Sequence, residues 1–229
     1  MIAWLNRHLF VVNRRPWLHR AMIAASLAMV FTAGCSHAPQ RYATFNHKIF
    51  QLSHEGLYDS GIAFITPSSV TGQEEEKQAV AFTFADALSK ALPELKVIHL
   101  SKTLSDINAA GLADDYRRMY DNYRNTGIFD RATLRQVGTA TQTRYLGQLK
   151  LAAFQQGSIG RFSIFGLRMV ETKFANLRLF FQIWDSDTGG IVWEGVEELS
   201  WSEETVSETT VTLQNVLAYT ATQMAAKLP

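Results

Sequence analysis

The sequence predicts an α/β (α+β) protein with a mixed sheet of about five strands, packing helices and a C-terminal strand-turn-strand-helix. Two patterns support this class. Short apolar runs alternate with helical periodicity up to about residue 142, and side chains alternate with period two from residue 143 onward. An apolar run near the amino terminus sets the first residues apart from this domain.

The first part of the domain predicts a strand, a helix and a second strand. The segment GIAFITP is short, apolar and ended by proline, which is typical of a buried strand. The next segment begins with glutamates and has apolar residues at helical spacing, so it predicts a helix with one packed face. These apolar residues are Val80, Phe84, Ala87, Leu88 and Ala91. The second strand is LKVIHL, which follows Pro93.

Two or three further helices are expected before residue 143. The segment ADDYRRMYDNYRNTG places Tyr116, Tyr120 and Tyr123 on one stripe of a helix. Asp130 is a candidate N-cap for the helix that follows, because an aspartate side chain can accept from the first free backbone N–H groups.

The second half predicts three strands and a final helix. The strands are TRYLGQLKLAAFQ, GLRMVETKFANLRLFFQIWD and GIVWEGVEELSW, and they show the alternation of half-buried strands. The helix covers about residues 203–228, with Leu217 and Met224 on its packing stripe.

Asp187-Thr188-Gly189 has the residues that surround the catalytic carboxylate of aspartic proteases. Such sites need two carboxylates that share a proton, and this chain holds one copy of the tripeptide. The residues before it, Asp185 and Ser186, are polar, whereas the proteases have apolar residues there. Apolar strands flank the tripeptide on both sides, and Asp, Ser, Thr and Gly favour turns. The sequence therefore predicts a hairpin turn.

The amino terminus predicts a lipoprotein export signal over residues 1–34. Four arginines without an acidic residue precede an apolar run of about 14 residues, too short to span a membrane. The run ends in TAGC, which resembles the bacterial lipobox, with Thr32 where leucine is usual. Cys35, the one cysteine of the chain, is the predicted lipid attachment site. Ser36 after it resembles the outer-membrane sorting pattern.

Three parts of the chain follow from this signal: residues 1–34 as signal peptide, 35–60 as lipidated N-terminus and tether, and 61–229 as a single periplasmic α/β domain. The segment NRRPWL resembles the twin-arginine signal, so twin-arginine and Sec export both stay open. Without the signal, 18 of the 22 Lys and Arg remain against 21 acidic residues, a net charge of −3. This charge predicts no nucleic-acid partner.

The known catalytic and metal-binding motifs are absent from the sequence, which has no GxSxG, Walker A, GxGxxG or HExxH segment. Four histidines follow the signal, without metal-ligand spacing: His37, His47, His54 and His99. We therefore expect no enzyme activity, no cofactor and no metal, although a site of dispersed residues is an open alternative.

Two stretches are candidate partner surfaces. Residues 155–169 combine glycine and serine with Phe162, Ile164 and Phe165, which favours either a loop that docks on a partner or lipid, or a long hairpin that packs on its own domain. The stripe of Tyr116, Tyr120 and Tyr123 favours either helix packing or, given tyrosine enrichment at interfaces, a binding platform.

The order of elements resembles a group of bacterial envelope lipoproteins, those with the periplasmic α/β domain of the curli-secretion lipoprotein and of the lipoprotein activators of penicillin-binding proteins. The residues that resemble this group are FFQIWDSDTGGIVWEG, as strand, turn and strand, and DRATLRQVGTATQTRYLGQLKLA, as a helix leading into a central strand. The resemblance covers about residues 61–229. Residues 111–131 and the glycine- and phenylalanine-containing loop have no counterpart in it.

The leading hypothesis is an outer-membrane lipoprotein that faces the periplasm. It would be held by its N-terminal lipid and would act as a non-enzymatic, protein-binding accessory or assembly factor of an envelope machine. The partner would be an envelope protein or further copies of the chain. The alternatives are an envelope enzyme or small-ligand binder with a site of dispersed residues, or a subunit of an oligomeric secretion pore.

Overall fold

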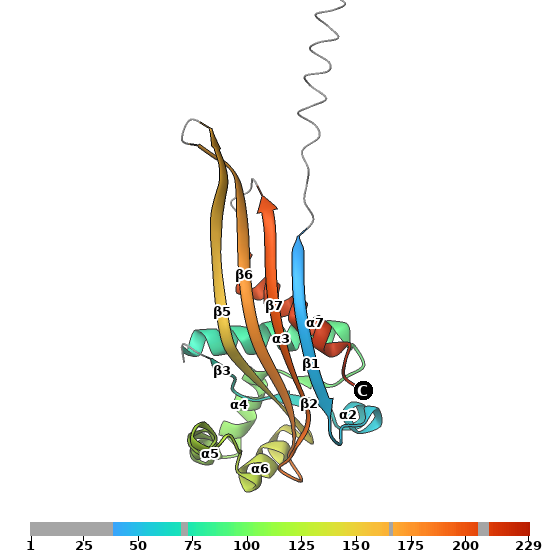
Figure 1. The fold of residues 1–229 in the computed structure, drawn as a ribbon. Coiled ribbons are helices and arrows are strands. Elements are labelled where there is room, and N and C mark those ends of the chain that lie inside the picture. The colour runs from blue at the N-terminus through green and yellow to red at the C-terminus, as the bar shows by residue number, and fades with distance from the viewer. Residues whose placement is uncertain (1–38, 70–72, 165–166, 206–210) are drawn as a thin grey trace, which may run out of the picture. The chain divides into compact units, whose positions relative to one another are not determined.

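The computed structural model describes residues 39–69, 73–164, 167–205 and 211–229; for 161–164, 167–170 and 205 it describes the backbone alone. These residues belong to one compact unit, Ala38–Pro229. Within the described ranges there are seven strands in one sheet and six helices (Figure 1). The predicted α/β class is confirmed, and the sheet has two strands more than expected.

Four long strands form an antiparallel group, and three short strands extend it. The order across the sheet is β1-β7-β6-β5-β2-β4, with β3 beside β5. The long strands are β1 (Gln40–Ile49), β5 (Tyr145–Ile164), β6 (Leu167–Asp185) and β7 (Ile191–Thr205). The short strands are β2 (Ile62–Phe64), β3 (Ser68–Ser69) and β4 (Val97–Ile98). β2 runs parallel to both β4 and β5, and β3 runs parallel to β5. β1 and β3 are the two strands that were not predicted from the sequence.

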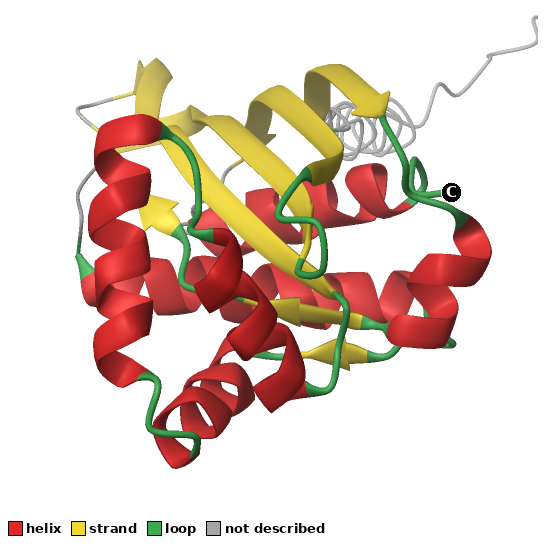
Figure 2. Ribbon diagram, turned by 90° about the horizontal axis from the view of Figure 1, so that it is seen from below, coloured by secondary structure: helices red, strands yellow, loops and turns green. Residues whose placement is uncertain are grey.

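The helices cover the two sheet faces unequally. On one face lie α3 (Glu74–Ala91) and α7 (Leu213–Ala225), which pack on one main core cluster with residues such as Phe84, Phe181 and Trp193. On the other face lie α4 (Leu100–Ala109), α5 (Ala113–Thr126) and α6 (Arg131–Thr141). These three helices pack on a second cluster with Leu146 and Trp184, at the end of the sheet where β6 turns into β7 (Figures 1 and 2). We call this end the turn end.

Local sequence explains where the helices begin and end. Asp130 is the N-cap of α6 and accepts a hydrogen bond from the backbone N–H of Thr133, as predicted. Thr212 and Asn215 form a capping box at the start of α7. α5 ends at Gly127, whose φ of 72° favours glycine.

The segment predicted as a tether is largely part of the fold. Residues 40–49 form β1, which pairs with β7 from Gln40–Ser202 to Ile49–Trp193. The next residues form α2 (His54–Ser60), which begins at the N-cap Ser53 and buries Leu57. The sequence did not predict this strand, because all its side chains except Phe45 are exposed. It therefore lacks the alternation of apolar and polar residues that marks a half-buried strand. Among the described residues, no helix is long and apolar enough to cross a membrane.

Candidate interaction surface

Away from the turn end, one face of the antiparallel strands carries no helix of the described chain. We call this surface the open face. It consists of every second side chain of four neighbouring strands (Figure 1). The members are Tyr42, Thr44, Asn46 and Lys48 on β1, Glu194, Val196, Glu198 and Ser200 on β7, Asn176, Arg178, Phe180 and Gln182 on β6, and Lys150, Ala153 and Gln155 on β5.

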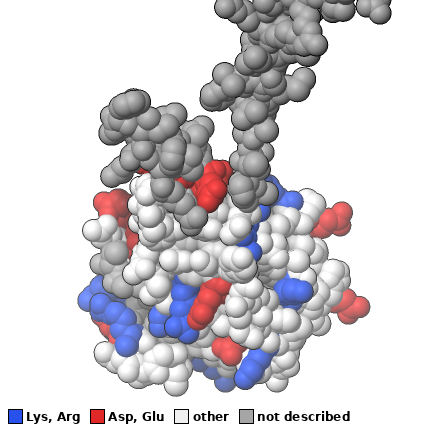
Figure 3. Space-filling view, turned by 45° about the horizontal axis from the view of Figure 1, so that its top comes forward, with Lys and Arg blue, Asp and Glu red and all other residues white. Residues whose placement is uncertain are grey.

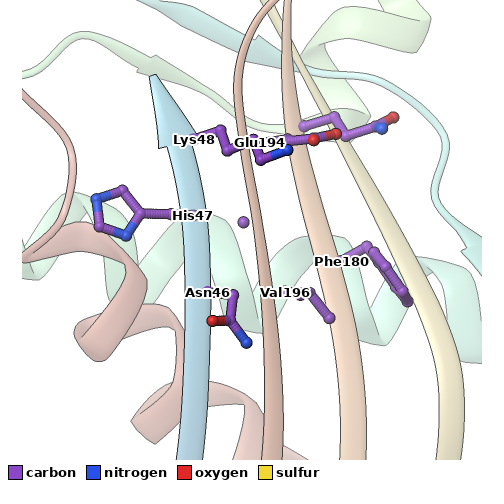
Figure 4. A pocket seen from close by; sticks show the side chains of 8 residues that line it. Asn46, His47, Lys48, Phe180, Glu194 and Val196 are labelled. Atoms are coloured by element: carbon purple, nitrogen blue, oxygen red, sulfur yellow. The ribbon is translucent and has the colours of Figure 1, made fainter. Parts of the chain in front are cut away.

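The part of the open face nearer the turn end holds a depression of about 290 Å³. Asn46, Phe180, Glu194 and Val196 line it, and Lys48 lies directly opposite Glu194 across β1 and β7 (Figure 4). The side chain of His47 points to the opposite side of β1. The floor of the depression is therefore apolar at Phe180 and Val196, with charged groups at its rim.

A second depression of about 490 Å³ lies farther from the turn end on the same face. Arg178 and Glu198 form an ion pair across it with a nitrogen–oxygen distance of 3.0 Å. Beside them the Ser200 hydroxyl donates to the Asn176 side-chain oxygen at 2.8 Å. The Tyr42 side chain at its margin is 71% exposed. Amide, hydroxyl and paired charged groups around exposed apolar side chains give a surface that can dock on protein.

Charges on the visible side of the molecule do not form a patch of one sign. Acidic and basic side chains lie beside one another between uncharged areas (Figure 3). This pattern agrees with the ion pair of Arg178 with Glu198 and the register of Lys48 against Glu194.

Asp187-Thr188-Gly189 forms the predicted turn between β6 and β7. Gly189 has a φ of 76°, and its N–H donates to the Asp185 carbonyl at 2.8 Å. The Arg131 and Arg135 side chains donate to the backbone carbonyl of Asp187 at 3.0 and 2.9 Å, which joins α6 to the turn. The Asp187 carboxylate is 62% exposed and lies 3.6 Å from Arg144.

The buried carboxylate of this turn is Asp185. Its side chain is 2% exposed and accepts two hydrogen bonds from the Arg144 guanidinium, at 3.2 and 2.7 Å. It also accepts the backbone N–H of Asp187 at 2.9 Å. Burial, the largest single influence, would raise the pKa of Asp185, but the bonds and charge of Arg144 together with the backbone N–H groups of the turn outweigh burial, and the pKa is lowered. Asp185 therefore shapes the turn as a charged acceptor.

The stripe of three tyrosines on α5 contacts other parts of the protein. Tyr116 is 8% exposed, and its hydroxyl lies 3.0 Å from the Thr66 hydroxyl. The Tyr120 hydroxyl donates to the Thr66 carbonyl at 2.7 Å, and the Tyr123 ring stacks on Phe129 at 4.1 Å. Burial raises the pKa of all three phenols. These contacts are of the kind expected for helix packing.

Tyr116 and Tyr120, which bond Thr66 after β2, occupy the place where open α/β sheets commonly bind ligands, beyond the carboxyl ends of parallel strands at the switch point. Here β2 lies between β4 and β5 and runs parallel to both. Beyond β2, the buried Gln148 amide accepts from the Tyr120 hydroxyl at 3.2 Å and donates to Ser68 at 3.3 Å. β3 then lies against β5. Described side chains and backbone thus fill this position.

The remaining predicted site residues lie partly or wholly outside the described part of the structure. Cys35 and Phe165 lie outside the described residues. Phe162 and Ile164 lie in β5, where only the backbone is described. The backbone there continues the β5–β6 hairpin: Phe162 pairs with Val170, and Ile164 with Leu167.

Glu197 is a buried carboxylate that sequence reasoning missed. It is fully buried on β7, between Phe45 on β1 and Leu179 on β6, and contacts α7 through the Thr220 hydroxyl at 3.4 Å. Burial raises its pKa to about 7. The period-two pattern offered a signal, because Glu197 falls in phase with the buried Trp193 and Leu199. Among the described residues, no group of three or more His, Cys, Asp or Glu could hold a metal ion.

The fold and this surface define an α/β protein with a mixed sheet. On one face of this sheet, the helices cover only the turn end, and the antiparallel strands beyond it form the open face. No family model and no curated protein matches the chain. Among solved structures, the PelC dodecamer from Paraburkholderia phytofirmans is 12% identical with a TM-score of 0.39, over 82% of this chain and 94% of that one. Lipoprotein GNA1162 from Neisseria meningitidis is 13% identical with a TM-score of 0.35, over 73% and 99% of the two chains.

A PDZ domain protein from Parabacteroides distasonis is 9% identical with a TM-score of 0.35, over 91% of this chain and 40% of that one. All three TM-scores are below 0.5.

Proposed function

We propose that the protein is a lipid-anchored component of the bacterial cell envelope, held in the outer membrane by Cys35, whose folded unit binds a protein partner in the periplasm without catalysing a reaction. The observation that carries the binding role is the open face, a sheet surface across four strands with no helix of the described chain on it. An accessory or assembly factor of an envelope machine needs such a surface.

The anchor is supported by the sequence and by where the fold begins. TAGC ends the apolar run, and only a few residues separate Cys35 from Gln40, the first residue of β1. A lipid on Cys35 would thus lead almost directly into the edge of the sheet.

The anchor is tested with Cys35→Ser. We expect loss of metabolic labelling by a radioactive fatty acid and release of the protein from membranes. The matched control is Ser36→Ala, which keeps the cysteine and should stay labelled. A Cys35→Ser protein that still sediments with membranes after a carbonate wash would contradict the anchor.

The binding role is tested by photo-crosslinking in cells. A photoreactive amino acid replaces Gln182 on the open face, and the control replaces Phe82, which is 66% exposed on α3. Covalent adducts of defined mass at position 182 and their absence at position 82 are expected. Equal adducts from both positions, or none from position 182, would argue against the open face as the docking surface.

A further inference from the structure

The sheet ends in two long strand edges on opposite sides. β1 is the last strand on one side, and within the described chain its outer edge faces no strand over ten residues. On the other side, β2 and β3 pair with β5 only as far as Leu151. Beyond this point, Ala153–Gly160 pairs with β6 alone among the described strands. We call these the β1 edge and the β5 edge.

Such edges are unusual in a protein that stays alone. Unpaired strand edges attract other strands, and native proteins keep them short, cover them, bulge them or place charges on them. β1 has the charged side chains of Arg41 and Lys48, and β5 has a register shift at Ala152, but each edge also carries an exposed apolar side chain on the side of the open face. Tyr42 on the β1 edge is 71% exposed, and Ile159 on the β5 edge is 59% exposed.

The strand directions make the two edges compatible with each other. β1 is antiparallel to β7, β7 to β6, and β6 to β5, so β1 and β5 run in opposite directions. When two copies stand side by side in the same orientation, the β1 edge of one therefore meets the β5 edge of the next as an antiparallel pair. The sheet then continues from copy to copy without a change of pattern.

We propose that the partner of the β1 edge is the β5 edge of a second copy of this chain. The fitting register places Tyr42 opposite Ile159, Asn46 opposite Gln155, and Lys48 opposite Ala153. It keeps the open-face side chains on one side, since directly paired residues point to the same face. The two exposed apolar side chains then cover each other, and two amides become neighbours.

The position of β3 agrees with this register. The pairing ends with Ile49 opposite Ala152, next to Lys150 and Leu151, whose edge is occupied by β3. A shift toward the turn end would make β1 collide with β3. β3 therefore acts as a stop for the incoming strand.

The offset between copies also suits a closed ring. Within one chain, cross-strand pairing leads from Thr44 through Glu198 and Arg178 to Ala153, so Thr44 and Ala153 lie at the same height in the sheet. The proposed register places Thr44 opposite Gly157 of the next copy, which is an offset of four residues along β5. An offset of four residues is about 13 Å along the strand, and the four long strands of one copy, spaced by about 4.8 Å, are about 19 Å wide. The ratio of this offset to this width corresponds to a strand tilt of about 35° relative to the ring axis. Closed sheets have tilts of about 35–45°. A head-to-tail contact that closes gives a ring, and one that does not close gives a filament.

This inference goes beyond the proposed function, because it adds a second copy at the strand edges and leaves the open face uncovered, and the pairing itself does not depend on the lipid. The anchor adds an argument about orientation only. Copies in one orientation have the amino ends of β1 on the same side, as anchors in one membrane require. Antiparallel pairing of two β1 edges would place these ends on opposite sides.

Disulfide trapping tests the register. The double variant Asn46→Cys, Gln155→Cys is made in the full chain with Cys35→Ser, so the outcome is independent of the anchor. Two intervening strands separate β1 from β5 by about 14 Å within one copy, beyond the reach of an internal disulfide. We expect a ladder of dimers, trimers and larger species on a denaturing gel after oxidation. Each single-cysteine variant should stay monomeric, and circular dichroism confirms folding.

Two results would overturn the proposal: dimers from Asn46→Cys alone, which indicate pairing of two β1 edges, or no ladder from the folded double variant. Native mass spectrometry adds an independent measurement. Tyr42→Glu should shift the assembly toward the monomer, whereas Phe82→Glu, at a similarly exposed site on α3, should leave it unchanged. A monomeric parent chain, or equal effects of both substitutions, would also overturn the proposal.

Discussion

Two buried carboxylates at different places in the sheet are stabilised in opposite ways. Asp185, at the turn end, is 1% exposed and charged, because the Arg144 guanidinium and backbone N–H groups point at it. Glu197, under α7, is fully buried and contacts one hydroxyl, and its Oε2 has no hydrogen-bond partner within the described residues. The pKa of Asp185 is lowered and that of Glu197 is raised to about 7.

The comparison shows that burial alone does not decide the state of an acid. A carboxylate with a bidentate cation stays ionised, and one in an apolar layer retains its proton to neutral pH. Two polar side chains on β1, the strand beside Glu197, engage other partners. On β1 the Arg41 guanidinium lies 3.9 Å over the Trp201 ring, and the His47 ring stacks on Phe45.

The largest effect is expected from Arg144→Ala, which leaves the Asp185 carboxylate buried without its cation. The free energy of unfolding at pH 7 should fall by about 3 kcal/mol, because an uncompensated buried charge is strongly destabilising. Urea titration measures this, with Arg178→Ala, which removes an exposed ion pair, as the control. A loss below about 0.5 kcal/mol, the scale of a surface pair, would show that the Asp185 charge does not need Arg144.

Glu197→Gln should raise the free energy of unfolding by about 2 kcal/mol at pH 8 and change it little at pH 4.5. The folded pKa of about 7 exceeds the ordinary value of 4.5, so the native state holds a proton that the unfolded state releases. The contribution of Glu197 to stability is thus full below pH 4.5 and is lost as pH rises to about 7. Glu198→Gln, at an exposed neighbour, should leave the pH dependence unchanged. An unaltered profile in Glu197→Gln would show that this carboxylate does not titrate near neutrality.

Gly138→Ala should lower the free energy of unfolding by about 1.5 kcal/mol, through overpacking. A Cβ at Gly138 on α6 would lie 2.3 Å from the Ser186 hydroxyl and 2.9 Å from the Thr143 carbonyl. Ser186→Gly in the same chain removes the closest atom and should restore part of the loss. Thermal unfolding of both variants distinguishes this contact from general loss of helix stability.

The smallest effect is expected from Asp187→Asn. Its carboxylate is 62% exposed, and the neighbouring arginines of α6 bond its backbone carbonyl, which the substitution keeps. The free energy of unfolding should change by less than about 0.5 kcal/mol. Incubation with casein should yield no aspartic-protease cleavage from either form. Proteolysis that Asp187→Asn abolishes would contradict both the turn assignment and the proposed function.

The sequence predicted the elements that depend on residues close to one another along the chain. The turn at Asp187, the cap at Asp130 and the buried side of α3 at Val80, Phe84 and Leu88 follow from short-range patterns, and all are confirmed. Expectations failed where long-range contacts decide. The alternation in TRYLGQLKLAAFQ places Gln148 with Arg144 and Lys150 on the polar side of the strand, but Gln148 is buried, and the Tyr120 hydroxyl donates to it. The final helix was expected from about residue 203, but β7 continues to Thr205 and α7 begins at Leu213.

The candidate surface was not predictable for the same reason. Whether a strand face is covered depends on where helices from elsewhere in the chain pack, and no residue of the open face encodes this alone. Glu197 lies in GVEELSW, where neighbouring glutamates suggest solvent, and only its phase with Trp193 and Leu199 places it inside.

The pairing of β1 with β7 also constrains the order in which the chain folds. Gln40 lies beside Ser202, so about 160 residues must be available before the first strand finds its place. Contacts this far apart in sequence slow folding, whereas the β5–β6 and β6–β7 hairpins join strands that follow one another. The hairpins can therefore form before the first strand pairs with β7. The strand that follows the predicted lipid site would then be the last part of the sheet to fold.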